Sequence, residues 1–147
     1  PHVIEPSMGV DRTVLAVLLE SYEVIEGGRS DTTESIKEKE VVLRLPKTLA
    51  PIKVAILPLS KKEPLASKAK EIADNLRQNW MVQYDETGSI GKRYRRQDEI
   101  GTPYCVTVDF DTLEDNQVTV RDRDTMEQKR IKIDELNDFL SEQLNKN

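Results

Sequence analysis

Four cations crowd one short stretch of the sequence, IGKRYRRQDEI, around a single aromatic residue. The stretch contains Lys92, Arg93, Arg95 and Arg96, with Tyr94 in the middle. Cations bind the phosphates of a nucleic acid, and an aromatic ring can stack on an unpaired base. The same charges also suit a solvated helix face that is balanced by the acidic residues after it, and most charge runs are of that kind. RNA binding and a solvated face are therefore both open interpretations.

Two further arginines lie in a segment with the alternation of a strand. In VTVRDR, Val118 and Val120 alternate with Thr119, Arg121 and Arg123. Because successive side chains of a strand point to opposite faces, the two arginines are expected to project together from one face. In that position they would stack on bases or fork toward base edges, which favours RNA binding.

The first residues, PHVIEPSMGVDRTVLAVL, hold another candidate for ligand binding. A strand-like PHVIEP leads through Ser7 and Gly9 into a helix, and Arg12 falls in the first helical turn. Glycine lets a backbone approach closely, and a helix start with a guanidinium suits an anionic ligand. A capped helix start with a solvated arginine is the commoner meaning of such a pattern.

Residue types exclude several other kinds of chemistry. The net charge of -5 means that nucleic-acid binding must come from a local patch. The single His2 and single Cys105 cannot supply the four ligands of a structural zinc site, so no metal is predicted. They also form no recognisable nucleophile pair. Cys105 lies in an apolar stretch and is expected to be a buried thiol.

The chain shows no signal for membranes or secretion. No apolar run approaches the roughly 20 residues that a membrane span requires, and the first residues lack the order of a secretory signal. A cytoplasmic protein without a membrane partner is therefore expected.

The hydrophobic pattern divides the chain into two folded pieces. Residues 10–22 have the spacing of a well-buried helix, which Gly27 and Gly28 end. Residues 26–40 are almost all charged, small or hydroxylated, so we expect a linker over 29–40 between segments 1–28 and 41–147.

The second piece has the alternation of an α/β domain. Residues 52–59 predict a buried parallel strand, residues 64–80 a helix, MVQYDE a strand, IGKRYRRQDEI a helix and YCVTVDF a third strand. A hairpin of QVTVRDR and EQKRIKI and a helix from Asp134 follow. We therefore predict three layers, with a mixed five-stranded sheet flanked by helices, and binding at the C-terminal edge of the sheet.

The segment EPSxGxDR before an apolar helix resembles motif 3 of class II aminoacyl-tRNA synthetases, in the form seen in glycyl-tRNA synthetases. The resemblance assigns the ATP-binding arginine to Arg12. It places Glu5, Ser7 and Gly9 around the ATP and glycine pocket. A guanidinium can neutralise phosphates, and a carboxylate and a hydroxyl can hold a small ammonium group.

The segments RRQDEIGTPYCVTVDF and VRDRD resemble the anticodon-binding domain that closes the glycyl-, threonyl-, prolyl- and histidyl-tRNA synthetases. The resemblance covers about residues 41–143 and implies contacts with anticodon bases and with the tRNA backbone. Thr112 departs from the glutamate common in threonyl enzymes, so contacts do not transfer base by base. The implied base contacts are Asp109, Phe110, Asp111, Thr112, Arg121 and Arg123, and the implied backbone contacts are Lys92, Arg93, Arg95 and Arg96.

The resemblance also implies a whole enzyme, a homodimeric glycine–tRNA ligase. That enzyme forms glycyl-adenylate from glycine and ATP with Mg²⁺, and then transfers glycine to tRNA(Gly). Motifs 1 and 2 would lie before Pro1, so this chain alone is expected to bind no cofactor and not to aminoacylate. Its expected part is recognition of the anticodon.

Two other classes of protein are weaker interpretations. A non-catalytic relative, such as the synthetase-like accessory subunit of a mitochondrial DNA polymerase, has no reason to keep Glu5, Ser7 and Arg12. A flavodoxin-like ligand-binding module is disfavoured because no Gly-rich phosphate loop follows the first strand.

Overall fold

The computed structural model describes residues 2–27, 29 and 39–145. Its helices are α1 (Val10–Ser21), α2 (Leu65–Leu76), α3 (Ile90–Ile100), the short α4 (Thr112–Asp115) and α5 (Leu136–Asn145), with the 3-10 turn η2 (Ile133–Glu135) before α5. Its strands are β1 (Tyr22–Ile25), β2 (Glu40–Leu43), β3 (Val54–Pro58), β4 (Val82–Tyr84), β5 (Tyr104–Val108), β6 (Gln117–Asp122) and β7 (Gln128–Lys132).

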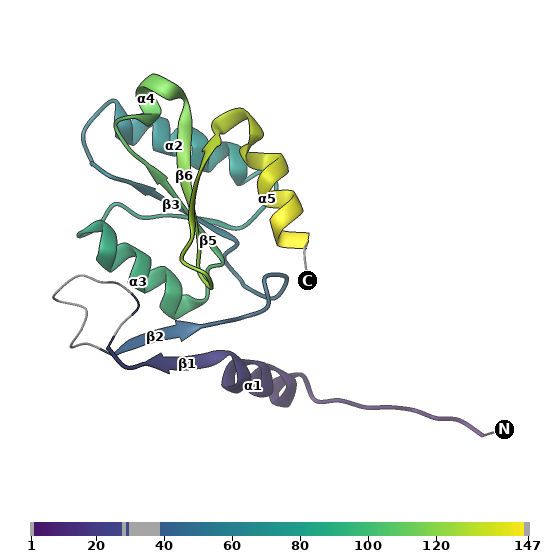
Figure 1. The fold of residues 1–147 in the computed structure, drawn as a ribbon. Coiled ribbons are helices and arrows are strands. Elements are labelled where there is room, and N and C mark those ends of the chain that lie inside the picture. Colours follow the sequence, from purple (N-terminus) through teal and green to yellow (C-terminus); the bar gives the residue numbers. More distant parts are fainter. Residues whose placement is uncertain (1, 28, 30–38, 146–147) are drawn as a thin grey trace.

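The last five strands form one mixed sheet in the order β4-β3-β5-β6-β7. β3 pairs in parallel with β4 and β5, whereas β6 and β7 are antiparallel to their neighbours. All residues of β3 and β5 are buried, because helices cover both faces of the sheet. The predicted three-layer α/β fold with a five-stranded mixed sheet is confirmed (Figure 1).

The main core lies between one face of the sheet and the helices α2 and α5 (Figure 1). The predicted stripe of α2 is confirmed, since Leu65, Ala69, Ile72 and Leu76 are all buried. Trp80, expected at the end of the same stripe, lies beyond the helix and packs partly buried against this core. Burying each large apolar side chain contributes roughly 1.5–3 kcal/mol, so this layer supplies most of the apolar stabilisation.

A smaller apolar cluster lies on the opposite face, under α3. Ala55, Leu57 and Cys105 are its buried members, and Ile90 and Tyr94 of α3 pack against them. Cys105 is buried, so the predicted buried thiol is confirmed, and this burial raises the pKa of the thiol to about 12. Because α3 brings mostly polar side chains to the sheet, hydrogen bonds and ion pairs must complete this interface.

An unpredicted two-stranded sheet lies against α3. β1 pairs antiparallel with β2, from Tyr22 opposite Leu43 to Ile25 opposite Glu40. The first helix therefore ends at Ser21, several residues before Gly27, because the chain turns directly into β1. The expected linker connects these two paired strands, and its residues 30–38 lie outside the described part of the chain.

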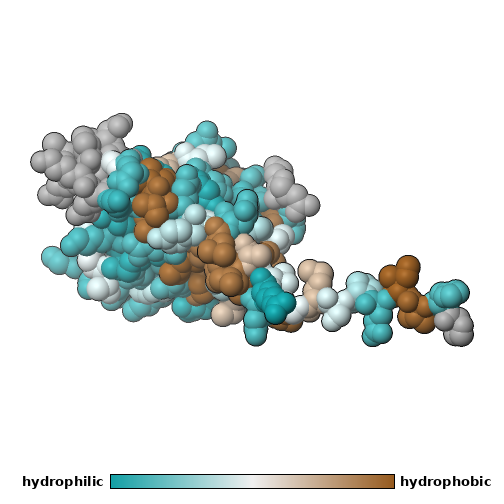
Figure 2. Space-filling view, turned by 90° about the horizontal axis from the view of Figure 1, so that it is seen from below, coloured by the Kyte–Doolittle hydropathy of each residue, from teal (hydrophilic) through white to brown (hydrophobic). Residues whose placement is uncertain are grey.

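The apolar stripe of α1 is largely exposed, so the prediction of a well-buried helix is wrong. Val14, Leu15 and Leu18 are 51%, 56% and 40% exposed. Figure 2 shows apolar side chains gathered over α1 and β1 on the face seen from below. α1 contacts β2, but only Ser21 at the helix end is buried. No helix in the described part of the chain combines the length and apolarity that a membrane crossing requires.

The strand predicted at the start of the chain is also absent. Residues 2–9 have no regular secondary structure, and this segment extends away from the sheet (Figure 1). A strand needs a neighbour to complete its backbone hydrogen bonds, and no described strand lies beside these residues.

Candidate nucleic-acid interface

Arg93, expected among the contacts to the RNA backbone, is buried. Only 3% of it is exposed, and its Nη1 donates to the carbonyl oxygens of Pro58 at 2.6 Å and Asp85 at 3.3 Å. The spacing of Ile90, Arg93 and Gln97 places all three on the helix face that packs on the sheet. The expectation is therefore corrected, because Arg93 crosslinks the ends of β3 and β4 inside the protein.

The other three cations of α3 remain at the surface. Lys92 is exposed. The Arg96 side chain is 44% exposed and pairs with Asp85 at 2.5 Å, and the Arg95 side chain is 34% exposed and lies 3.7 Å from Glu40. An RNA phosphate can approach these three side chains without unfolding the helix. Their contact with an RNA backbone stays a prediction.

The alternation predicted for β6 is confirmed, but its polar face is covered by α3. Val118 and Val120 point into the main core. Arg121 points to the opposite face and is only 3% exposed. The expectation that this arginine projects toward a ligand is wrong for this conformation, because α3 packs over it.

Arg121 forms a bidentate ion pair with a carboxylate of α3. Its Nη1 and Nη2 donate to the two carboxylate oxygens of Asp98, each at 3.0 Å, and its guanidinium carbon lies 4.7 Å from the ring centroid of Tyr94. Burial, the largest single influence, lowers the pKa of Arg121, but the hydrogen bonds and negative charge of Asp98, together with Cys105 and Tyr94, raise it by more in sum, so the pKa lies above its usual value. The arginine is therefore a charged crosslink between β6 and α3.

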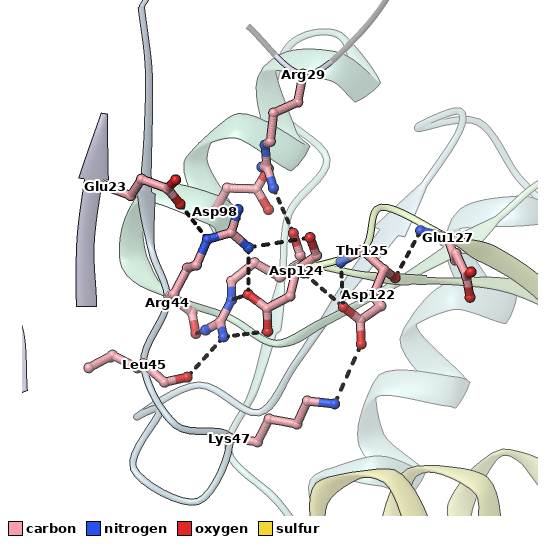
Figure 3. A network of polar contacts seen from close by, with 12 residues as sticks. Glu23, Arg29, Arg44, Leu45, Lys47, Asp98, Asp122, Asp124, Thr125 and Glu127 are labelled. Atoms are coloured by element: carbon pink, nitrogen blue, oxygen red, sulfur yellow. Dashed lines mark hydrogen bonds and ion pairs between the residues drawn. The ribbon is translucent and has the colours of Figure 1, made fainter. Parts of the chain in front are cut away.

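Arg123 has a similar internal role and is 2% exposed. It donates to the carbonyl oxygens of Gly101 at 2.8 Å and Leu45 at 2.9 Å, and it also pairs with Asp124 at 2.8 Å. Asp124 also accepts a hydrogen bond from Arg44 at 3.1 Å (Figure 3). The expected outward projection of Arg123 is also wrong, because its N–H groups donate to carbonyl oxygens inside the protein.

The loop after β5 is built around a reciprocal pair of polar residues. Asp109 accepts hydrogen bonds at Oδ1 from the backbone N–H of Thr112 at 2.9 Å and from its hydroxyl at 2.8 Å. Arg130 donates to Asp109 and to Asp115, each at 2.6 Å. Asp109 and Thr112 therefore shape the loop, and Arg130, which the sequence did not single out, holds it against β7.

The remaining loop residues point outward. Phe110 is 57% exposed, and Asp111 is exposed at the start of α4. An exposed ring on a loop fixed at both ends is a suitable platform for a base that is not paired. Phe110 is thus the member of the predicted base-contact set that is both aromatic and accessible.

The predicted base contacts fall into two groups at opposite ends of β5. The register pairs Cys105 with Arg121 and Thr107 with Thr119. Arg121 therefore lies beside the start of β5, whereas Asp109 directly follows its end. The accessible group is the one at the C-terminal edge of the parallel strands, where the fold predicts ligand binding.

The candidate anion site at the start of the chain lies on α1 and the segment before it, away from α4 (Figure 1). Glu5, Ser7 and Arg12 are exposed. Gly9 caps α1 with an extended backbone, and a Cβ there would meet nothing within 4 Å. The close approach of a ligand to the backbone at Gly9 stays a prediction.

Stability should depend on pH through Asp124. Burial, the largest single influence, raises the pKa of this carboxyl, but the hydrogen bonds and positive charges of Arg123 and Arg44 together lower it by more, so it lies below the usual 3.8. The charged form is favoured in the folded state, so its contribution is complete above pH 3.8 and is lost as pH falls through the lower folded pKa. Urea unfolding of wild type and Asp124→Asn should therefore differ most at neutral pH and converge in acid. A difference that stays constant down to about pH 2 would contradict this assignment.

Comparison with known families agrees with the fold. A family model described as "Anticodon binding domain" matches residues 53–143, which is more than half of the chain. The chain belongs to this family of anticodon-binding domains.

Curated relatives named glycine--tRNA ligase are similar to nearly the whole chain. The one from Thermobifida fusca is 56% identical over 144 residues, which cover 98% of this chain and 30% of that protein. The relative from Corynebacterium efficiens is 56% identical with 98% and 31% covered, and that from Clostridium acetobutylicum is 54% identical with 98% and 29% covered. The predicted resemblance to glycyl-tRNA synthetases is confirmed, and the chain spans about 30% of the length of these relatives.

Proposed function

We propose that this chain recognises the anticodon arm of tRNA(Gly) as part of a glycine–tRNA ligase. The observation that carries the proposal is the identity of 54–56% to glycine--tRNA ligases over 98% of the chain. The match to an anticodon-binding domain supports RNA as the partner. In such an enzyme this domain selects the tRNA, while the chemistry takes place elsewhere.

The loop at the end of β5 is the proposed point of base contact. Phe110 offers an exposed ring, and Asp111 beside it offers a carboxylate that can accept from a base amino group. Asp109 and Thr112 fix the loop, and Arg130 anchors it. Because the loop is preformed, stacking of a base costs little ordering of the protein.

The arginines divide into surface and internal groups in this scheme. Arg95 and Arg96, with Lys92, lie where they can meet phosphates of the anticodon stem. Arg121 and Arg123 already use their N–H groups inside the protein. We assign them an indirect part in base recognition, which is to hold α3 and the β6–β7 turn in place.

The segment before β1 would serve the catalytic part of the whole enzyme. Arg12 lies in the first turn of α1, whose N-cap makes no side-chain hydrogen bond, so a phosphate of ATP fits this helix start. Glu5, Ser7 and Gly9 precede it and would help to enclose ATP and glycine. Magnesium would enter with ATP and neutralise its phosphates. A homodimer in the cytoplasm completes the proposal for the whole enzyme.

The first test is binding of this chain to tRNA(Gly) transcripts at one fixed salt concentration. Replacing the last two anticodon cytosines should weaken binding by about 1 kcal/mol or more per base. Phe110→Ala should weaken binding to the unaltered transcript by about 1–3 kcal/mol, because a stacked base loses its platform. It should also reduce the discrimination between the transcripts. Fluorescence anisotropy with labelled transcripts measures all of these affinities.

A matched control is Leu113→Ala, which removes another partly exposed apolar side chain nearby, on α4. This variant should keep the discrimination. Equal binding of all transcripts by the wild-type chain would rule out anticodon recognition by this chain. Unchanged discrimination in Phe110→Ala would rule out the loop as the point of base contact.

A further inference from the structure

Charged residues of alternating sign form a chain from the surface of α3 to β6. Arg95 lies 3.7 Å from Glu40, and Glu40 pairs with Arg29 at 3.4 Å. Arg29 pairs with Asp98 at 2.5 Å, and Asp98 pairs with Arg121 at 3.0 Å. We call these five residues the ion chain. Its outer end is 34% exposed at the Arg95 side chain, and its inner end is 4% exposed at Arg121.

The members of the ion chain depend strongly on one another. Asp98 is a single carboxylate shared by two guanidinium groups, Arg29 and Arg121, and its side chain is 6% exposed. A buried charge that loses its partner is costly, so each ion pair restricts where the next side chain can lie. Arg29 also donates from Nη1 to the carbonyl oxygen of Arg123 at 2.6 Å, which fixes it to the turn after β6.

The ion chain joins parts of the fold that are distant in sequence. Glu40 belongs to β2 of the small sheet, and Arg29 lies shortly after the end of β1, the other strand of that sheet. Arg95 and Asp98 belong to α3, and Arg121 belongs to β6. Figure 3 shows the Arg29 side chain extending toward Asp98. A change in these pairings therefore changes how α3 holds the β1–β2 sheet.

We propose that Arg29 and Asp98 are positioning residues that couple RNA binding at α3 to the placement of the β1–β2 sheet. This inference rests on the proposed tRNA partner. A phosphate that approaches Arg95 competes with Glu40 for its guanidinium. Glu40 then interacts more strongly with Arg29, and the altered position of the Arg29 side chain changes its ion pair with Asp98. By reciprocity, a fixed β1–β2 sheet favours the arrangement of α3 that binds RNA.

The experiment is hydrogen exchange of the full chain, alone and with a saturating tRNA(Gly) transcript, read by mass spectrometry over β1 and β2. Arg29→Met removes the central cation and keeps an unbranched side chain. In the free protein it should speed exchange of these amides by about tenfold or more. The control Arg77→Met removes an exposed partner of Asp74 on α2 and should leave β1 and β2 unchanged.

The comparison with RNA separates coupling from simple stabilisation. In wild type, bound tRNA should slow exchange in β1 and β2 by several-fold, whereas in Arg29→Met the transcript should bind without slowing it. Binding by wild type with no change in β1 and β2 overturns the inference alone. Equal slowing in wild type and Arg29→Met also overturns it. Failure of wild type to bind the transcript overturns the proposed function, and the coupling with it.

Discussion

Asp98→Ala is expected to reduce the free energy of unfolding by about 3–5 kcal/mol, because it removes one partner from a buried ion pair. The substitution leaves Arg121 and Arg29 facing each other without their shared carboxylate. Arg121 is 3% exposed and cannot reach water without moving α3 off the sheet. Urea unfolding followed by circular dichroism measures the loss at constant pH.

The control for this substitution is Asp74→Ala. Asp74 also pairs with an arginine, Arg77, at 2.6 Å, but its side chain is 70% exposed. Exposed pairs of this kind contribute about 0–1 kcal/mol, so the control should lose little stability. If both substitutions lower the free energy of unfolding by the same amount, the burial of Asp98 does not strengthen its ion pairs. The crosslink between β6 and α3 is then not a stabilising feature.

Gly101→Ala is the second substitution with a large expected effect, about 2–5 kcal/mol of destabilisation. Gly101 ends α3 with φ at +82°, a left-handed conformation that costs about 1–2 kcal/mol for a residue with a Cβ. A Cβ there would also lie 2.9 Å from the carbonyl oxygen of Leu43 and 3.0 Å from Cδ1 of Leu45. The strand end or the helix end must therefore move.

Gly88→Ala separates the two contributions to this loss. Gly88 has nearly the same φ, +81°, but a Cβ there would meet nothing within 4 Å. Gly88→Ala should lower the free energy of unfolding only by the cost of the left-handed conformation, about 1–2 kcal/mol. Thermal and urea unfolding of both variants give the difference directly. Equal losses would mean that the segment after β2 yields to the added methyl group without cost.

The central fold could be predicted because its elements have strong periodicity. The apolar run of β3, the stripe of α2 and the alternation of β6 each have one good structural solution. β1 and β2 were missed because each has four residues and because their pairing spans a charged segment. The four residues of α4 give no helical periodicity at all.

The candidate site was harder to predict than the fold. Residue type identifies arginine as a partner for phosphates and bases. It does not show whether the guanidinium already forms an ion pair with a carboxylate inside the protein. Asp98 lies 23 residues before Arg121, and only the packing of α3 on β6 brings them together. The spacing of Tyr94 and Asp98 on one helix face was the available signal, since both face Arg121.

The open edge of the sheet at β7 affects how this protein behaves at high concentration. Three of its five residues, Lys129, Arg130 and Lys132, are cations, and all three are exposed. A second molecule that extended the sheet here would bring identical charges together and bury them. The opposite edge, β4, has only three residues and offers a short template. Both edges therefore disfavour aggregation through strand pairing, so the chain is expected not to polymerise through this sheet at high concentration.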